Sequence, residues 1–309
     1  MKSISVYDTT LRDGMQGIEV NYTLEDKIQI AHKLDDMRID YIEGGFPLSN
    51  EKEAAFFERM KEEQFTHAKI AAFGSTRRPG QTAAKDPHMV ALINAGTKAV
   101  TVVGKTWKAH VEKVLQTTTK ENKEMIRESV DFLKSSDREV VMDFEHFFDG
   151  YKDDSVYAVE LLTTASEAGA DVLVLCDTNG GILPHEVTAI IEALPKAELA
   201  PLGVHFHNDC GTADANTLAG VLDGAVHVQG TVNGWGERCG NANICVFVPN
   251  ICLKTDFTMN IGSHLEHLTS LARFVAEKAN IIPNKRQPYV GEAAFSHKGG
   301  QHADVISKA

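Results

Sequence analysis

The sequence predicts an α/β fold, a closed (β/α)8 TIM barrel with a helical linker extension at its C-terminal end. Short apolar runs rich in β-branched residues recur at intervals of roughly 25–40 residues, and most are separated by segments with helical apolar spacing. Strands that alternate with helices indicate parallel pairing with right-handed crossovers. Eight such units in about 230 residues suit a closed barrel. An open doubly wound sheet is the alternative, but no Gly-x-Gly-x-x-Gly pattern follows the first run.

Each expected strand is a short apolar run that ends in turn-forming or polar residues. The eight strands are expected at Ser3–Asp8, Asp40–Gly44, Ala68–Phe73, Ala99–Val103, Glu139–Phe144, Asp171–Cys176, Leu202–His207 and Ala225–Thr231. The first helix, Leu24–Met37, is preceded by Thr23, which forms a capping-box arrangement with Asp26. Further helices are expected at Ala54–Lys61, Glu121–Lys134, Val156–Ala168, Pro184–Leu194 and His264–Ala279.

Composition excludes several classes of partner. The formal net charge of -12 argues against nucleic acid or an anionic membrane as the main partner. No apolar run approaches the roughly 20 residues that a membrane span needs, and no signal peptide is expected, because the N-terminus enters a strand pattern at once. The five cysteines are odd in number and form no Cys-x-x-Cys pair, so neither a disulfide framework nor a zinc knuckle is expected. This pattern favours a reducing cytoplasm.

A pair of histidines, His205 and His207, ends the seventh expected strand. Side chains at positions i and i+2 of a strand leave the same face, so both imidazoles are expected to point to one spot. Two imidazoles and one carboxylate form an open site for a divalent cation. Asp13 is the expected carboxylate, because the first, seventh and eighth strands are near neighbours in a closed barrel, and Asn241 could add an amide oxygen. Mn, Zn, Co and Mg all remain compatible, and a half-exposed pair without a metal is the alternative.

Polar residues gather where the expected strands end, which is where the active site of a (β/α)8 barrel lies. Some of these polar residues are explained by turn formation alone. The number of Arg, Asp, Glu and His residues at the ends of four separate strands is greater than turns require. The candidates in strand order are Arg12, Asp13 and Gln16; Glu43; Asp143, Glu145 and His146; Asp177, Thr178 and Asn179; His205, His207 and Asp209; and the loop Asn233–Asn243.

Arg12 beside a metal-bound Asp13 requires an anion to pair with it. A 2-oxo acid would meet this need, because its carboxylate and keto oxygen can chelate the metal while Arg12 stabilises charge that develops on the keto oxygen. Glu145 is then a candidate for orienting the substrate or moving a proton, and Thr178 and Gln16 are candidates for substrate binding. A plain surface ion pair between Arg12 and Asp13 is the alternative.

Four long stretches resemble the signatures of one known family. They are Leu11–Gln16 followed by Lys27, Leu202–Ala213, Gly234–Asn243 and Phe295–Asp304. These stretches are similar to the 2-isopropylmalate/homocitrate/citramalate synthase family, part of the metal-dependent DRE-TIM metallolyase group that includes hydroxymethylglutaryl-CoA lyase. Two stretches, Met142–Lys152 and Gly230–Cys239, resemble the citramalate synthase subfamily.

The resemblance implies a Claisen-type condensation of acetyl-CoA with a 2-oxo acid, followed by thioester hydrolysis. In the citramalate synthase subfamily the acid is pyruvate, and the product feeds isoleucine synthesis, a branched-chain amino acid pathway. The family pattern places metal ligands at Asp13, His205, His207 and Asn241, catalytic residues at Arg12 and Glu145, and a substrate contact at Thr178. His297 falls on a histidine that acts on acetyl-CoA and that reaches in from the partner subunit of a homodimer; His302, in the same loop, is the weaker candidate.

The resemblance also implies how the chain is divided. Residues 1–260 are expected to form the catalytic barrel, and residues 261–309 to begin a linker subdomain, so that the chain ends before a regulatory domain. Three alternatives remain: a 2-isopropylmalate or homocitrate synthase, a lyase that cleaves a hydroxyacyl-CoA in the reverse direction, and a non-catalytic barrel. Loss of Arg12 or of either histidine would have favoured the last of these.

Overall fold

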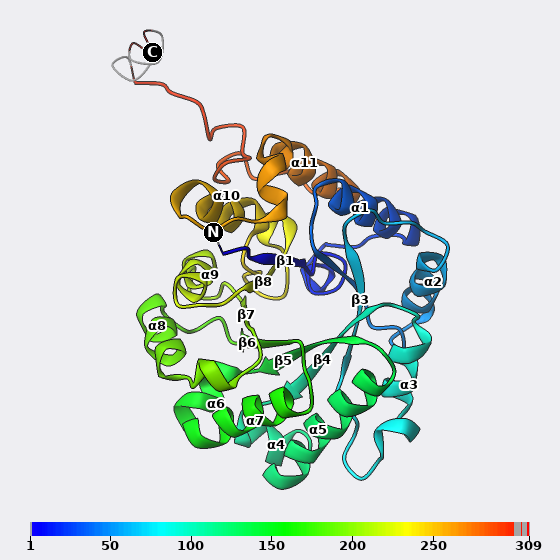
Figure 1. Cartoon of the computed structure of the whole chain (residues 1–309). Coiled ribbons are helices and arrows are strands. Elements are labelled where there is room, and N and C mark those ends of the chain that lie inside the picture. Colours follow the sequence, from blue (N-terminus) through cyan, green and yellow to red (C-terminus); the bar gives the residue numbers. More distant parts are fainter. Residues whose placement is uncertain (1, 300–303, 305–307, 309) are drawn as a thin grey trace.

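A computed structural model describes residues 2–299, 304 and 308 of the chain. Eight parallel strands form a closed barrel in sequence order, and the eighth pairs with the first (Figure 1). The strands are β1 Ser5–Asp8, β2 Tyr41–Gly45, β3 Lys69–Ser75, β4 Ala99–Lys105, β5 Glu139–Glu145, β6 Val172–Asp177, β7 Leu202–Phe206 and β8 His227–Gly230. All eight expected strands are confirmed, with small shifts at their ends.

Helices surround the barrel (Figure 1). They are α1 Leu24–Asp36, α2 Glu51–Met60, α3 Pro87–Asn94, α4 Lys108–Lys113, α5 Thr119–Ser135, α6 Phe147–Asp153, α7 Ser155–Glu167, α8 Pro184–Ala193, α9 Ala213–Leu222, α10 Ile244–Lys254 and α11 Leu268–Lys278. The expected start of the last helix at His264 is wrong, because Asn260–His267 is a 3-10 segment in which His264 has non-helical backbone angles. No helix in the described part of the chain is long and apolar enough to cross a membrane.

The first helix begins as its sequence predicts. Thr23 Oγ1 accepts a hydrogen bond from the Asp26 backbone N–H at 3.1 Å, and Asp26 Oδ2 accepts one from the Thr23 N–H at 3.1 Å. Lys27, which belongs to the first signature, is fully buried, and its Nζ donates to both carboxylate oxygens of Glu53 at 2.6 and 2.8 Å. This pair ties α1 to α2, so Lys27 stabilises the fold and lies outside the residues that line the candidate site.

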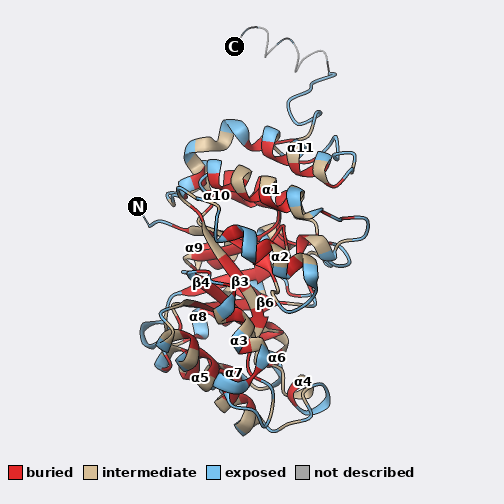
Figure 2. Cartoon of the chain, turned by 90° about the vertical axis from the view of Figure 1, so that its right-hand side faces the viewer, coloured by how far each residue is buried: buried red, intermediate tan, exposed pale blue. Residues whose placement is uncertain are grey.

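Two layers of apolar side chains make the core. A small cluster fills the inside of the barrel, and a larger one lies between the strands and the helices. Figure 2 shows the buried strands and inner helix faces in red, with exposed residues on the outer surface. The parallel register aligns the carboxyl ends of neighbouring strands: Val103 pairs with Asp143, and His205 pairs with Gln229. Residues at these ends are therefore brought to one mouth of the barrel.

The segment after residue 260 packs on the barrel. Lys278 Nζ of α11 lies 3.3 Å from Asp26 Oδ1 of α1, and the Asn233 side-chain amide donates to the Ala272 carbonyl at 2.9 Å. After α11 the chain still contacts the barrel, through Gln287 Nε2 to Asn233 Oδ1 at 3.3 Å and Tyr289 Oη to Asn250 Oδ1 at 2.6 Å, and only then runs away from it (Figure 1). A separate linker subdomain that starts at residue 261 stays a prediction.

Candidate metal centre and active site

Asp13 and the histidine pair meet at the mouth of the barrel. Asp13 Oδ2 lies 3.3 Å from His205 Nε2 and 3.9 Å from His207 Nε2, and the two Nε2 atoms are 3.3 Å apart. All three residues are buried. Asp13 is held by the tight loop after β1, in which the Gly14 N–H donates to the Thr9 carbonyl at 3.0 Å. The prediction that Asp13, after the first strand, lies beside the two histidines at the end of the seventh is confirmed.

The donor set fits a divalent cation. Neighbouring ligands about 2.1 Å from one ion lie about 3.0–3.4 Å apart, which matches the separation of the two histidine nitrogens. Asp13 Oδ1 and Asn241 Oδ1 are buried and have no hydrogen-bond partner within the described residues. A buried oxygen without a partner is costly unless an ion or water satisfies it. Asp13, His205 and His207 can therefore hold a metal ion.

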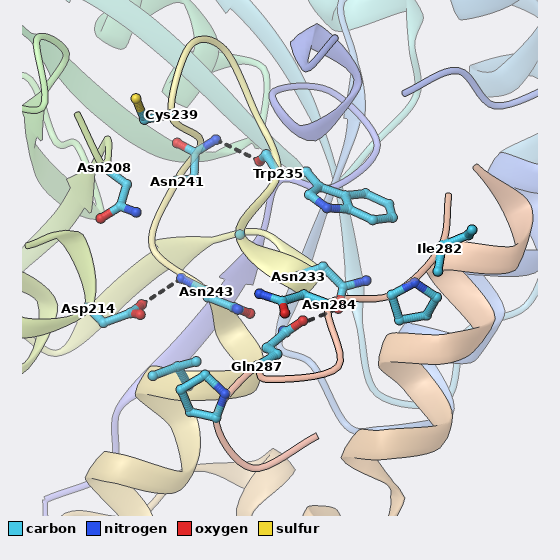
Figure 3. Close-up of a pocket in the computed structure, with 14 residues that line it drawn as sticks. Asn208, Asp214, Asn233, Trp235, Cys239, Asn241, Asn243, Ile282, Asn284 and Gln287 are labelled. Atoms are coloured by element: carbon cyan, nitrogen blue, oxygen red, sulfur yellow. Dashed lines mark hydrogen bonds between the residues drawn. The ribbon is translucent and has the colours of Figure 1, made fainter. Parts of the chain in front are cut away.

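Asn241 reaches this region from the loop after β8. Its backbone forms an antiparallel bridge with His207, and its side-chain nitrogen donates to the Trp235 carbonyl at 3.1 Å (Figure 3). This bond leaves Oδ1 as the unpartnered atom. The expected amide ligand is thus beside the histidine pair, and its part in holding the ion stays a prediction.

The pKa values of Asp13 and His207 are shifted toward the protonation states that bind a metal ion. Burial opposes the ionisation of Asp13, but the charge of Arg12 and a hydrogen bond with His205 hold the pKa of Asp13 below its usual range. Burial and the neighbouring His205 lower the pKa of His207 to about 4. Burial also disfavours a charged His205, but the hydrogen bond and charge of Asp13 outweigh it and raise the pKa of His205. Near pH 7 the site therefore offers a carboxylate and a neutral His207 ring.

Arg12 has a partner that sequence reasoning missed. Its Nε donates to Glu43 Oε2 at 2.6 Å, and its guanidinium lies 4.0 Å from the Phe73 ring centre. Glu43 is fully buried and also accepts from the Tyr7 hydroxyl at 2.9 Å, while Tyr7 lies 2.6 Å from Thr101 Oγ1. The surface-pair alternative is wrong, and the need for an outside anion is weaker than expected, because Glu43 already pairs with Arg12. The signal in the sequence was that Glu43 is a charged residue within the expected second strand.

A cavity of about 280 Å³ adjoins the metal-ligand group. It contains the expected substrate residues and an apolar side that the sequence did not reveal, because strand residues of the core have the same composition. Its lining is Arg12, Asp13, Gln16, Phe73, Val103, Asp143, Glu145, Cys176, Thr178, His205, His207 and Glu237. The volume suits a small organic substrate, and the lining combines charged groups with the apolar side chains of Phe73, Val103 and Cys176.

Glu145 and Thr178 are held by neighbouring strand ends. Lys105, at the end of β4, forms an ion pair with Glu145, with which it is also in register across β4 and β5. Thr178 Oγ1 accepts a hydrogen bond from the His146 backbone N–H at 2.9 Å. Lys105 was not predicted, although its place beside the end of β5 follows from the register once the barrel is known.

His297 is not among the residues that line this cavity. It lies in the exposed segment that follows Gly291. Its delivery from a partner subunit stays a prediction. His302 lies outside the described residues.

A second cavity, of about 430 Å³, is lined in part by Asn241, the candidate amide ligand (Figure 3). Its walls are rich in amide side chains from the loops after β7 and β8, and the segment after α11 closes one side. Its lining is Asn208, Asp214, Asn233, Gly234, Trp235, Cys239, Asn241, Asn243, Val246, Ile282, Pro283, Asn284, Gln287 and Pro288. The metal-ligand group is therefore flanked by two hollows of different chemistry.

The HMGL-like family model matches residues 3–275, which is most of the chain. The chain belongs to the HMGL-like family. This HMGL-like chain is 50% identical to an (R)-citramalate synthase of Geobacter sulfurreducens, over 100% of the chain and 58% of that protein. It is 51% identical to an (R)-citramalate synthase of Aquifex aeolicus, over 99% of the chain and 58% of that protein. It thus spans less than two thirds of the length of these relatives.

Solved structures agree with the barrel. An HMG-CoA lyase of Bacillus subtilis has a TM-score of 0.75 and 22% identity, over 92% of this chain and 96% of that one. At this identity the likeness shows the fold alone. It confirms the TIM barrel of the HMGL-like chain. The reaction has to be inferred from the site and from the more similar relatives.

Proposed function

We propose that this HMGL-like chain is the catalytic barrel of an acyltransferase that condenses acetyl-CoA with pyruvate to give citramalate and CoA. The observation that carries the proposal is the 50% identity, across the whole chain, to a protein named (R)-citramalate synthase. A homocitrate synthase of Methanopyrus kandleri is 34% identical, which makes that alternative less favoured. The lyase alternative depends on fold likeness at 22% identity and below, and it is not favoured either.

A divalent ion, held by Asp13, His205 and His207 with Asn241 as a further ligand, would supply Lewis acidity toward the keto oxygen of the oxo acid. Arg12 stabilises the negative charge that develops on that oxygen when the new carbon–carbon bond forms. Its guanidinium is already oriented by Glu43, so little reorganisation is required. Each ligand residue is buried, which strengthens these electrostatic effects.

The remaining cavity residues bind the acid and move protons. Gln16 and Thr178, which line the cavity, would donate hydrogen bonds to the substrate carboxylate, and Glu145, which also lines it, would take or return a proton. His297 would remove a proton from the acetyl methyl group, and it would reach the site from the partner subunit of a homodimer. Water then cleaves the thioester, with the leaving CoA sulfur taking up a proton. We further propose the division into a barrel at 1–260 and a linker from 261, a cytoplasmic location, and a place in isoleucine synthesis.

The full-length protein, incubated with acetyl-CoA and one oxo acid at a time, tests this proposal. The acids are pyruvate, 2-oxoisovalerate and 2-oxoglutarate, and the measurement is the release of CoA thiol. We expect the highest kcat/KM with pyruvate. If none of the three acids supports thiol release, the synthase proposal is refuted. A clear preference for another acid would refute the choice of pyruvate.

An Arg12→Lys variant tests the mechanism. An ammonium group cannot reproduce the planar fork that contacts Glu43 and the substrate, so we expect turnover to fall by orders of magnitude, while the fold and bound metal are retained. Arg59→Lys is the matched control, because Arg59 is half-exposed and pairs with Glu63 just beyond the end of α2. Near-normal turnover of Arg12→Lys would remove Arg12 from the mechanism.

The metal is tested by content and by removal. Mn, Zn, Co and Mg are the candidates, and elemental analysis of the purified protein identifies which is bound. We expect chelation to abolish thiol release and re-addition of the ion to restore it, while Asp13→Asn lowers the bound metal per chain. Full activity after complete removal of divalent metal would contradict the proposed role.

A further inference from the structure

Gln229, in β8, contacts the histidine of the candidate metal centre from behind. Its Oε1 lies 2.9 Å from His205 Nδ1, on the side of the ring opposite to Asp13. Its Nε2 donates to Asp143 Oδ1 at 3.0 Å. Gln229, Asp143 and His205 are 1%, 3% and 5% exposed, so water does not compete for these bonds. The three side chains form one continuous hydrogen-bonded line inside the barrel.

Asp143 determines which way the Gln229 amide faces. A carboxyl group keeps an acceptor oxygen in either protonation state, so the NH₂ end of the amide has a partner at Asp143. The carbonyl end then faces His205 and can only accept. His205 Nδ1 must therefore carry a proton, so that, when an ion displaces the Nε2 proton that Asp13 accepts, the Nε2 lone pair faces the space shared with His207 and Asp13.

We infer that Gln229, oriented by Asp143, is a positioning residue that selects the metal-binding tautomer of His205. This inference rests on the proposed metal centre and goes beyond it, because neither Gln229 nor Asp143 is among the proposed ligands. Metal-binding histidines generally donate their second N–H to a neighbouring acceptor, and loss of that acceptor weakens metal binding. Here the acceptor is a neutral amide, which orients the ring without adding a charge to the centre.

The strand register explains why this position is available. Gln229 lies beside His205 across the β7–β8 pair and beside Tyr7 across the β8–β1 pair, so its side chain faces the inside of the barrel. Asp143 reaches it from β5. An apolar side chain at 229 would fill the same volume but would leave both His205 Nδ1 and Asp143 without this partner.

The first test is the tautomer itself. Nitrogen-15 NMR of the metal-free protein at alkaline pH, with His205→Asn used to assign the signal, reports which ring nitrogen carries the proton. We expect Nδ1–H in the unmodified protein and a mixture of tautomers in Gln229→Met. Asp143→Asn keeps an acceptor for Gln229 and should retain Nδ1–H, whereas Asp143→Leu should not. An Nε2–H ring in the unmodified protein would overturn the inference, even if a variant fails to fold.

The second test is metal affinity, measured by titration with Mn²⁺ and with Zn²⁺. We expect Gln229→Met to weaken binding by roughly 10–100-fold. Gln287→Met is the matched control, because Gln287 is a buried glutamine that contacts Asn233 and lines the other cavity, and its affinity should not change.

The two proposals fail in different ways. If the unmodified protein binds neither ion, the proposed metal centre is wrong. If it binds and Gln229→Met binds equally well, the metal centre stands and the role of Gln229 is refuted.

Discussion

Replacing Arg12 with methionine would leave the buried Glu43 carboxylate without its charged partner and should lower the free energy of unfolding. Glu43 is fully buried, and its partners are the Arg12 Nε at 2.6 Å and the Tyr7 hydroxyl at 2.9 Å. In Arg12→Met only the hydroxyl remains. Breaking a buried ion pair by removing one partner costs about 3–5 kcal/mol, because a charge is left without compensation.

We therefore expect Arg12→Met to lower the free energy of unfolding by about 3 kcal/mol at pH 7.

Urea unfolding of the metal-free protein at pH 7 measures this loss. Arg59→Met is the control, because its half-exposed pair with Glu63 should contribute less than about 1 kcal/mol. Adding Glu43→Gln to Arg12→Met should recover much of the loss, because the buried charge is removed together with its partner. A loss below about 1 kcal/mol in Arg12→Met would refute the reasoning, as would a double variant no more stable than Arg12→Met.

Three further predictions concern stability. Asp35→Asn should cost about 1–3 kcal/mol at pH 7, because the carboxylate accepts three backbone N–H groups at residues 66–68. Burial raises the pKa of Asp35, but these bonds outweigh it and lower that pKa; the stabilisation is therefore present above pH 4 and disappears as the pH falls, which acid-dependent unfolding measures. Gly240→Ala should lower the melting temperature strongly, because Gly240 has a φ of 91° and an added Cβ would lie 2.0 Å from the Gly234 carbonyl oxygen. Divalent metal at 100 times its Kd should add about 2.7 kcal/mol to the unfolding free energy, and Asp13→Asn should remove most of that gain.

Strand positions could be predicted from the sequence because each strand is an apolar, β-branched run with polar ends. Several helices could not. α4 and α6 have six and seven residues, too few for a periodic pattern, and α10 contains Pro249, which normally argues against a helix interior. Tertiary packing decides such segments, because their inner faces are buried against the barrel.

The metal-ligand group could be predicted because a strand places residues two apart on one face, as with His205 and His207. Its supporting contacts could not. Glu43 lies 31 residues from Arg12, and Asp143 lies 86 residues from Gln229, so both contacts depend on which strands become neighbours. Lys105 and Glu145 meet for the same reason, through the β4–β5 register. A single sequence gives the residue types at strand ends but not their partners.

The chain of contacts from Arg12 through Glu43 and Tyr7 to Thr101 runs from the loop after β1 into the buried interior of the barrel. It has an evolutionary consequence. In a homologue that has lost catalysis, loss of Arg12 alone would still be unfavourable, because the buried Glu43 would be left without its partner and would destabilise the fold. Lineages that lose Arg12 should therefore also replace Glu43 with a neutral residue, and co-inheritance of the two positions would distinguish retired copies from working enzymes.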